Sequence, residues 1–287
     1  MSSTTTMRFA LQQAQAQGLA RIDAQMLLLH ALGRAAHDRA WLIAHDDDAL
    51  PAGAQIAFAG FVQRRLQGEP VAYLTGRKAF YGLDLAVDER VLDPRPDTET
   101  LVDWALEVLA PLSAPHAIDL GTGSGAIALA LKARRPDAQV SAVDASEAAL
   151  ALARANAQAL ALPLHLRHGH WLEGVAECFD LIVSNPPYVA EGDPHLAALT
   201  HEPRMALVSG ADGLADIRAI VGQAPARLRP GGWLLLEHGH DQASQVQALM
   251  QESGFIQVQG RKDLAGITRC TGGAIPAPRI PAAAGVE

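Results

Sequence analysis

The chain has 287 residues, of which 49% are hydrophobic and 5% aromatic, and its 31 acidic against 23 basic residues give a formal net charge of -8. This length suits one large domain, or one large and one small domain, with enough apolar residues for a sizeable core. The acidic balance argues against a protein that grips a nucleic acid backbone, so no direct nucleic acid partner is expected.

Two further absences narrow the class of protein. The cysteines, Cys178 and Cys270, have no CxxC spacing, which predicts neither a disulfide framework nor a zinc site. The first residues lack the basic and apolar regions of a signal peptide, and no apolar run reaches the ~18 residues that span a bilayer. We therefore expect a cytoplasmic protein with no membrane partner and no bound metal.

Helical spacing of apolar residues marks the chain from residue 7 to about residue 75. In the next stretch, apolar residues alternate at Leu83, Leu85 and Val87, as in a strand, and we interpret it as a β-hairpin. Helices are expected over 20–33, 38–45 and 52–67. The predicted division is a helical domain at 1–75, a hairpin linker at 76–95, a larger domain at 96–275 and a disordered tail at 276–287.

From residue 116 onward, short apolar strands alternate with helices. This order predicts an α/β protein with a Rossmann-like, mostly parallel sheet of seven strands covered on both faces. Ligands of such sheets bind at the carboxyl ends of the strands. The segment from Thr271 to Glu287 is rich in Ala, Pro and Gly, so we expect it to be disordered. Strands are expected near 117–120, 140–143, 164–167, 179–184, 233–237, 256–259 and 267–270.

A glycine-rich turn joins the first of these strands to a helix. Glycines allow positive φ angles and a close approach of the backbone to a ligand, and the helix N-terminus offers free N–H groups. The turn alone also fits the nicotinamide fingerprint GxGxxA, so it does not identify the cofactor. The candidate residues of this turn are Asp119, Gly121, Thr122, Gly123, Ser124 and Gly125.

The next strands supply two more candidate cofactor residues. Asp144 ends the second strand and can accept hydrogen bonds from a ribose diol. Trp171, after the third strand, is either an adenine platform or a core residue. Asp119 could meet a cationic group, and no basic residue for a pyrophosphate lies near the loop. These features favour S-adenosylmethionine as the cofactor.

The tetrapeptide Asn185-Pro186-Pro187-Tyr188 directly follows the fourth strand. The side-chain oxygen of Asn185 and the carbonyl of Pro186 can accept the two hydrogens of a planar –NH₂ group, which frees the nitrogen lone pair for methyl transfer. Tyr188 offers an aromatic face for the flat group. We interpret Asn185, Pro186 and Tyr188 as catalytic, and all four residues as the substrate site. The motif leaves an adenine and a glutamine nitrogen equally open.

With these residues, the chain resembles the peptide chain release factor N(5)-glutamine methyltransferases over residues 8 to 275. The resemblance implies cofactor contacts at 121–125, Asp144 and Trp171, an S-adenosylmethionine-dependent methyltransferase domain at 96–275, and a helical domain that recognises the substrate. It implies methylation of the glutamine in the Gly-Gly-Gln motif of class-one release factors, its protein partners. The resemblance to the family also rests on further motifs, at 68–76, 80–82, the Pro94–Glu99 segment within 92–99, Glu202-Pro203 and 211–214.

Two positions depart from the family pattern. His170 stands where the family often has an acid, which puts the contact to the adenine amino group in doubt, and Asp93 replaces an aliphatic residue. Three other functions stay open: adenine-N6 methylation of DNA or RNA, glutamine methylation of a ribosomal protein, and a non-catalytic module that only binds adenosine. Ordinary structural roles are expected for the scattered histidines His165, His168, His238 and His240.

Overall fold

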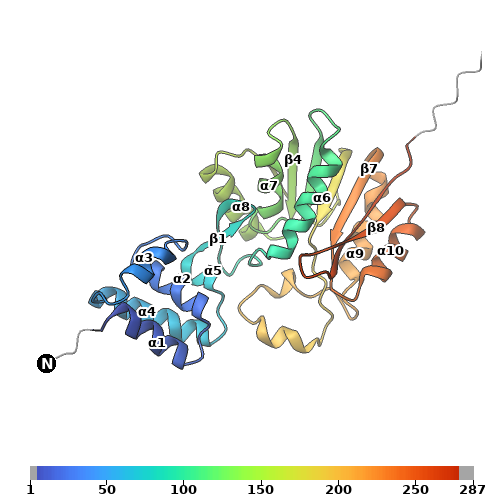
Figure 1. Cartoon of the computed structure of the whole chain (residues 1–287). Helices are drawn as coiled ribbons and strands as arrows, with labels where there is room; N and C mark the ends of the chain where they lie inside the picture. Colours follow the sequence, from blue (N-terminus) through green and yellow to red (C-terminus); the bar gives the residue numbers. More distant parts are fainter. Residues whose placement is uncertain (1–4, 278–287) are drawn as a thin grey trace, which may run out of the picture. The chain divides into compact units, whose positions relative to one another are not determined.

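The computed structural model describes residues 5–277. Contacts along the chain divide it into two compact units, and each is described by itself. One comprises Met1–Arg77 with Val87–Glu89 and Ala197–His201, and the other comprises Lys78–Ala86, Arg90–Leu196 and Glu202–Glu287. Figure 1 follows the elements of both units along the chain.

The first unit is built from short helices around its own apolar core. Thr6 caps the first helix by accepting a hydrogen bond from Phe9 N. The second helix buries Leu27, Leu28 and Leu29 completely, and this fully apolar stretch forms the centre of the unit. The helices are α1 (Met7–Ala16), α2 (Arg21–Ala31), α3 (Arg39–Ala44), α4 (Ala52–Leu66) and α5 (Val71–Thr75).

A two-stranded hairpin follows the helices. Its turn residues, Tyr81 and Gly82, both have positive φ angles, as a type I′ turn requires. Tyr81 N–H donates to Glu99 (2.8 Å) and its hydroxyl donates to Asp103 (2.6 Å), which attaches the turn to the helix of residues 99–109. The strands are β1 (Arg77–Phe80) and β2 (Leu83–Ala86).

The second unit contains a seven-stranded sheet in the order β5-β4-β3-β6-β7-β9-β8. The pairs from β5 to β7 are parallel, and β9 is antiparallel to both of its neighbours. The predicted Rossmann-like architecture is therefore confirmed. The strands are β3 (His116–Leu120), β4 (Gln139–Asp144), β5 (His165–His168), β6 (Phe179–Ser184), β7 (Leu228–Glu237), β8 (Ile256–Lys262) and β9 (Thr268–Ala274).

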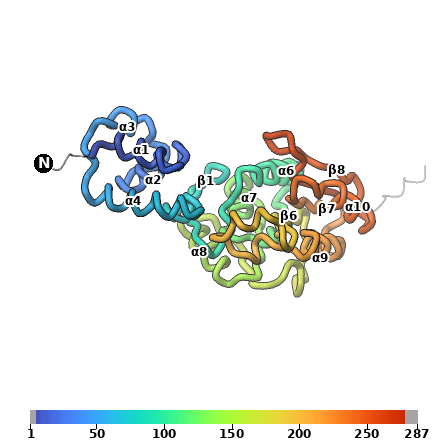
Figure 2. The backbone as a smooth tube through the Cα atoms, turned by 90° about the horizontal axis from the view of Figure 1, so that it is seen from below, coloured from blue at the N-terminus to red at the C-terminus, as the bar shows by residue number. Residues whose placement is uncertain are grey.

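Helices cover both faces of this sheet. Figure 2 shows α6 and α9 on opposite sides of β6 and β7. On β6, Ile182 joins an apolar cluster with Ile217 and Ile220 of α9, so its neighbours Leu181 and Val183 turn to the opposite face. Ser146 caps α8, because its hydroxyl accepts from Ala149 N (3.2 Å). The helices are α6 (Glu99–Leu109), α7 (Ala126–Arg134), α8 (Glu147–Ala159), α9 (Ala215–Gln223) and α10 (Ala243–Glu252).

The end of the sheet corrects one prediction. Residues 271–274, expected to begin a disordered tail, complete β9, and Thr271 is fully buried. A Cβ on Gly272 would lie 2.4 Å from Leu235 and 2.7 Å from Trp104, so glycine lets these two side chains pack against the strand. The part of the predicted tail at 278–287 lies outside the described residues. In the described chain, no helix is long and apolar enough to cross a membrane.

Candidate active site

The glycine-rich turn lies at the carboxyl end of β3. Gly121, Gly123 and Gly125 all have positive φ angles, which residues with a Cβ rarely adopt. The N–H groups of Gly121 and Thr122 donate to the carbonyl of Val143, which fixes the turn against β4 (2.8 and 3.0 Å). The backbone can therefore face a ligand without an intervening side chain.

The carboxylate of Asp144 connects this turn to the next helix. Its Oδ2 accepts from Gly123 N and its Oδ1 accepts from Ser146 N, each at 2.8 Å. Burial raises the pKa of this carboxyl, although both backbone hydrogen bonds favour its charged form. Asp144 thus holds the loop and also borders the pocket described below.

Asp119 lies beneath the turn and is 1% exposed. Its Oδ2 accepts from the Thr122 hydroxyl (2.6 Å) and from Ala128 N (3.3 Å). Its Oδ1 has no hydrogen-bond partner among the residues described. Burial raises the pKa of Asp119 to about 7. The carboxylate therefore supports the loop from below, and its predicted contact with a cationic ligand group stays a prediction.

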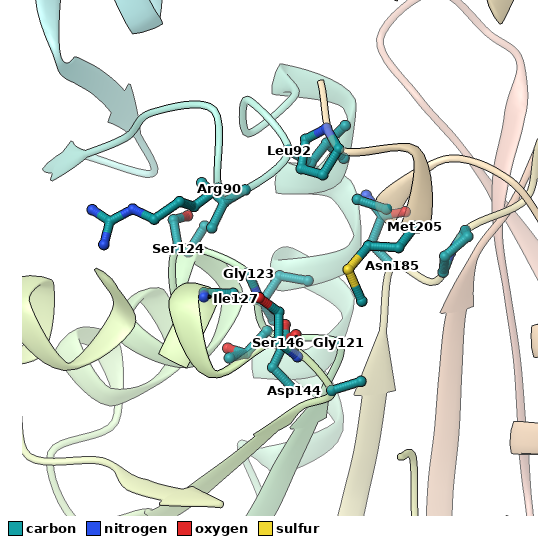
Figure 3. Close-up of a pocket in the computed structure, with 18 of the residues that line it drawn as sticks. Arg90, Leu92, Gly121, Gly123, Ser124, Ile127, Asp144, Ser146, Asn185 and Met205 are labelled. Carbon is teal, nitrogen blue, oxygen red and sulfur yellow. Dashed lines mark hydrogen bonds between the residues drawn. The ribbon is translucent and has the colours of Figure 1, made fainter. Parts of the chain in front are cut away.

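A cavity of about 310 Å³ opens above this loop, entirely within the second unit, and its size suits a small organic ligand. In Figure 3, Asn185 and Met205 lie on one side of the pocket and Gly123 and Asp144 on the other. The predicted residues that line it are Gly121, Thr122, Gly123, Ser124, Asp144, Trp171, Asn185 and Pro187. The predicted residues outside its lining are Asp119, Gly125, Pro186 and Tyr188.

Trp171 packs in the core and also lines the pocket, and its contact with adenine stays a prediction. It is 7% exposed and belongs to the apolar cluster beneath the sheet edge, yet its ring also borders the pocket. A Cβ on Gly121 would come within 3.1 Å of this ring, so the glycine permits the contact. His170 also lines the pocket, and its imidazole lies 3.7 Å from the Glu173 carboxylate.

The segment after β6 places an amide at the pocket wall. Asn185 Nδ2 donates to the hydroxyl of Thr98 (3.1 Å), whereas its Oδ1 is buried without a partner in the described part of the chain. The register of the sheet brings the Glu237 carboxylate close to Asn185. Ser184, which precedes Asn185, pairs with Leu236, which precedes Glu237. Glu237 is 2% exposed, and burial raises its pKa to about 7, although the Thr98 and Asn185 side chains lower it. Its Oε2, like Asn185 Oδ1, is buried without a hydrogen-bond partner among the residues described.

Tyr188 packs its ring against the apolar cluster instead of lining the pocket. Burial raises the pKa of its hydroxyl to about 12. Its carbonyl accepts from Gln242 Nε2 (3.1 Å) and lies so close to Gly213 that a Cβ there would be 2.3 Å away. The structure thus brings Asn185 and Pro187 to the pocket and leaves the stacking role of Tyr188 a prediction.

Thr98, Glu237 and Gln242 were not singled out by the sequence analysis. A signal existed for Glu237, because an acid that ends an apolar strand lies at the same edge as Asp144. No comparable signal existed for Gln242, whose amide reaches Tyr188 from the start of another helix.

An ion-pair network links the motifs that the family resemblance brought together. Arg95 lines the pocket and pairs with Glu202, a buried carboxylate from the Glu-Pro motif. Asp93, the unusual residue, pairs with Arg95 (3.3 Å) and with Lys78 (2.9 Å). These contacts connect the strand β1 and the segment before α6 to the loop that follows Asn185.

Among the scattered histidines and the cysteines, His238 has clear structural contacts. His238 is fully buried between the Gly239 carbonyl (2.9 Å) and the Thr271 hydroxyl (2.8 Å), and burial lowers its pKa. Cys178 is exposed and Cys270 is buried, and both are free. Within residues 5–277, no group of three His, Cys, Asp or Glu side chains is arranged to hold a metal.

Comparisons with known proteins first define the class. The family model of the methyltransferase small domain matches residues 98–262, and that of the PrmC N-terminal domain matches residues 5–76. A methyltransferase from Pyrococcus furiosus is similar in structure (TM-score 0.53, 20% identity, 77% of this chain and 100% of that one). A 16S rRNA methyltransferase of T. thermophilus in complex with AdoMet and guanosine is also similar (TM-score 0.51, 23% identity, 70% and 50%). The second unit therefore has a methyltransferase fold.

Sequence similarity then identifies the particular family. A release factor glutamine methyltransferase of Xylella fastidiosa is 49% identical over 271 residues, which cover 93% of this chain and 98% of the relative. The chain belongs to the release factor glutamine methyltransferase family.

Proposed function

We propose that this chain transfers a methyl group from S-adenosylmethionine to the side-chain amide nitrogen of a glutamine in class-one release factors, within their Gly-Gly-Gln motif, and so modulates translation termination. The observation that carries the proposal is the Asn185 amide, with an unpartnered buried oxygen, beside the pocket above the glycine-rich turn. Membership of the family and its N-terminal domain supports the same substrate. Because termination is cytoplasmic, the proposal implies a cytoplasmic location.

The pocket fits the proposed cofactor. Gly121 and Gly123 give open backbone at the floor, and Asp144 provides carboxylate oxygens that can accept from a ribose diol. The Trp171 ring borders the same space and can pack against adenine. The Oδ1 of Asp119 has no hydrogen-bond partner among the residues described and could accept from a cationic amino group only if the loop above it moves. When bound, S-adenosylmethionine supplies an electrophilic methyl group on a sulfonium.

The residues after β6 would act on the glutamine amide. Asn185 Oδ1 and the Pro186 carbonyl accept its two hydrogens, which holds the nitrogen out of conjugation and points its lone pair into the pocket. Tyr188, whose ring packs against the apolar cluster and not at the pocket, would have to turn toward the amide to pack along it. Fixed alignment of this kind can lower the barrier by roughly 7–11 kcal/mol, so no strong general base is required.

We also propose that the helical unit recognises the release factor. It has its own core and exposes large apolar side chains, among them Ile56 (76% exposed) and Ile43 (61%). A chain shortened to begin at Arg77 keeps the whole hairpin, whose turn binds Glu99 and Asp103. It should methylate a short Gly-Gly-Gln peptide at the full-length rate but the intact factor at least about tenfold more slowly. Equal rates on the intact factor would disprove the role.

One experiment separates the proposed substrate from its alternatives. The protein is incubated with labelled S-adenosylmethionine, a purified release factor, ribosomal proteins and total nucleic acid. We expect label in the release factor alone, on the glutamine of its Gly-Gly-Gln motif by mass spectrometry. Label in nucleic acid would favour adenine methylation, and label in a ribosomal protein would favour the related glutamine methyltransferases.

A further inference from the structure

We propose that Asp216 accepts a hydrogen bond from the adenine amino group of S-adenosylmethionine and so makes the pocket selective for adenine. This inference deepens the proposed function and rests on it for the identity of the cofactor. It assigns a role to a pocket-lining carboxylate that the chemistry described above does not use.

The two carboxylates that line the pocket within the described residues differ in their partners. Both oxygens of Asp144 accept from backbone N–H groups. The carboxylate of Asp216, in contrast, has no hydrogen-bond or ion-pair partner in the part of the chain that the structure describes. Asp216 is half-buried, and a carboxylate that is partly removed from water is stabilised by a hydrogen-bond donor. Its oxygens are therefore available to a donor of the ligand.

The first turn of α9 holds Asp216 at the pocket. Its backbone N–H donates to the hydroxyl of Ser209 (2.8 Å), which is itself buried, so the start of the helix is fixed. Leu214 and Ile217, on either side of Asp216 in the sequence, belong to the same buried apolar cluster as Trp171. The Trp171 ring borders the pocket as well. Asp216 therefore reaches the pocket from the same apolar layer as the proposed adenine platform.

The chemistry of the cofactor indicates which donor meets this carboxylate. S-adenosylmethionine carries hydrogen-bond donors on its ammonium group, its ribose diol and its adenine amino group. Asp119 is the candidate for the ammonium group and Asp144 for the diol, so the adenine amino group is left for Asp216. An ionised carboxylate can only accept, which matches an –NH₂ group. His170 also lines the pocket, but its imidazole is 52% exposed and lies 3.7 Å from the Glu173 carboxylate.

The test is a binding measurement that needs no methyl transfer. Calorimetry compares S-adenosylhomocysteine with its analogue that lacks the 6-amino group, on the wild type and on Asp216→Ala. The wild type should bind the adenine ligand about ten- to hundredfold more tightly, the range of a hydrogen bond to a charged group. Asp216→Ala should bind the two ligands equally within about twofold, because the acceptor is gone. Asp216→Asn keeps one accepting oxygen and should retain most of the preference.

Glu173→Gln is the matched control, because Glu173 is an exposed carboxylate that lies outside the pocket lining, and it should keep the wild-type preference. His170→Ala removes the competing side chain and should keep the preference too. A wild type without preference, or a preference that survives Asp216→Ala, would overturn the assignment. So would an Asp216→Ala variant that binds S-adenosylhomocysteine normally but has a raised KM for the release factor. A wild type that prefers adenine but leaves the release factor unlabelled would instead refute the proposed substrate and leave the role of Asp216 standing.

Discussion

At the scale of single residues, the Asn185 amide has its nitrogen bound by the protein and its oxygen free. When the Asn185 side chain is removed, the two prolines still hold the loop, but the substrate amide loses one hydrogen-bond acceptor. We expect Asn185→Ala to lower kcat by about 10²–10³, the loss typical of one preorganised polar group at a reacting centre. Single-turnover kinetics measures this loss. Calorimetry should find the affinity for S-adenosylmethionine within about twofold of the wild type, and a variant with full activity would refute the proposed role.

Asp144 should act on binding instead of on the chemical step. Its carboxylate accepts from the backbone of Gly123 and of Ser146, so Asp144→Ala removes a ligand acceptor and loosens the loop. We expect about ten- to hundredfold weaker binding of S-adenosylmethionine by calorimetry. Glu147→Gln, an exposed carboxylate three residues along the chain, should bind normally. An Asp144→Ala affinity equal to the wild type would show that the carboxylate does not contact the ligand.

The sequence located the residues at strand ends but not the side chains behind them. Asp144 and Asn185 follow apolar strands, and parallel strands end at one sheet edge, so their proximity could be foreseen. Thr98 lies 87 positions from Asn185 along the chain, and only the folded structure brings the two together. For Trp171 the sequence left a choice between adenine platform and core. The structure places it in the apolar core at the border of the pocket, so the core role is observed and the platform role stays a prediction.

At the scale of elements, the loop after Asn185 depends on Gly213. A Cβ there would lie 2.3 Å from the Tyr188 carbonyl, and the φ angle of +75° is unfavourable for residues with a side chain. We expect Gly213→Ala to destabilise the protein by about 2–4 kcal/mol, the sum of backbone strain and forced displacement. The displacement moves Tyr188, so kcat should also fall by at least about tenfold. Denaturant unfolding and steady-state kinetics measure the two effects.

Gly192→Ala is the matched control for this substitution. Its φ angle of +82° carries similar strain, but a Cβ there has no neighbour within 4 Å in the described residues. It should cost about 1–2 kcal/mol from strain alone and leave kcat unchanged. If both variants lost activity equally, general strain in the loop, and not the displacement of Tyr188, would explain the effect of Gly213→Ala.

The strands show where pattern reasoning works and where it fails. The strand β6 was predicted with its observed bounds, because an apolar run between turn residues is a strong signal. The last strand was cut short at Cys270, because Thr271-Gly272-Gly273-Ala274 has no bulky apolar residue. Leu235 and Trp104 fill the space that a side chain on Gly272 would occupy, and a Cβ on Gly273 would come within 3.1 Å of Phe255 and Val258. A strand buried under large neighbours can therefore look like a linker in sequence.

At the scale of the whole molecule, two buried carboxyls tie stability to pH. The pKa values of Asp119 and Glu237 are raised to about 7 by burial, far above the values of about 4 of unfolded chains. Between about pH 4 and about pH 7, the folded protein binds more protons than the unfolded chain, so the free energy of unfolding falls as pH rises. Burial raises the pKa of Asp144 too, which acts in the same direction. Carboxyls with lowered pKa values, such as Asp212 at about 2, make the free energy of unfolding rise with pH, but only in the acidic range below about pH 4.

The ligand-free protein should therefore be less stable at pH 8 than at pH 6, by about 1 kcal/mol for each of the two carboxyls with a pKa of about 7. Asp119→Asn and Glu237→Gln remove an ionisable group, so each should flatten this dependence by that amount in denaturant unfolding. Asp212→Asn breaks the ion pair with Arg218 and should change stability equally at both pH values. A wild type equally stable at pH 6 and pH 8 would mean that neither buried carboxyl titrates in this range. Both carboxyls would then stay ionised from about pH 6 to about pH 8.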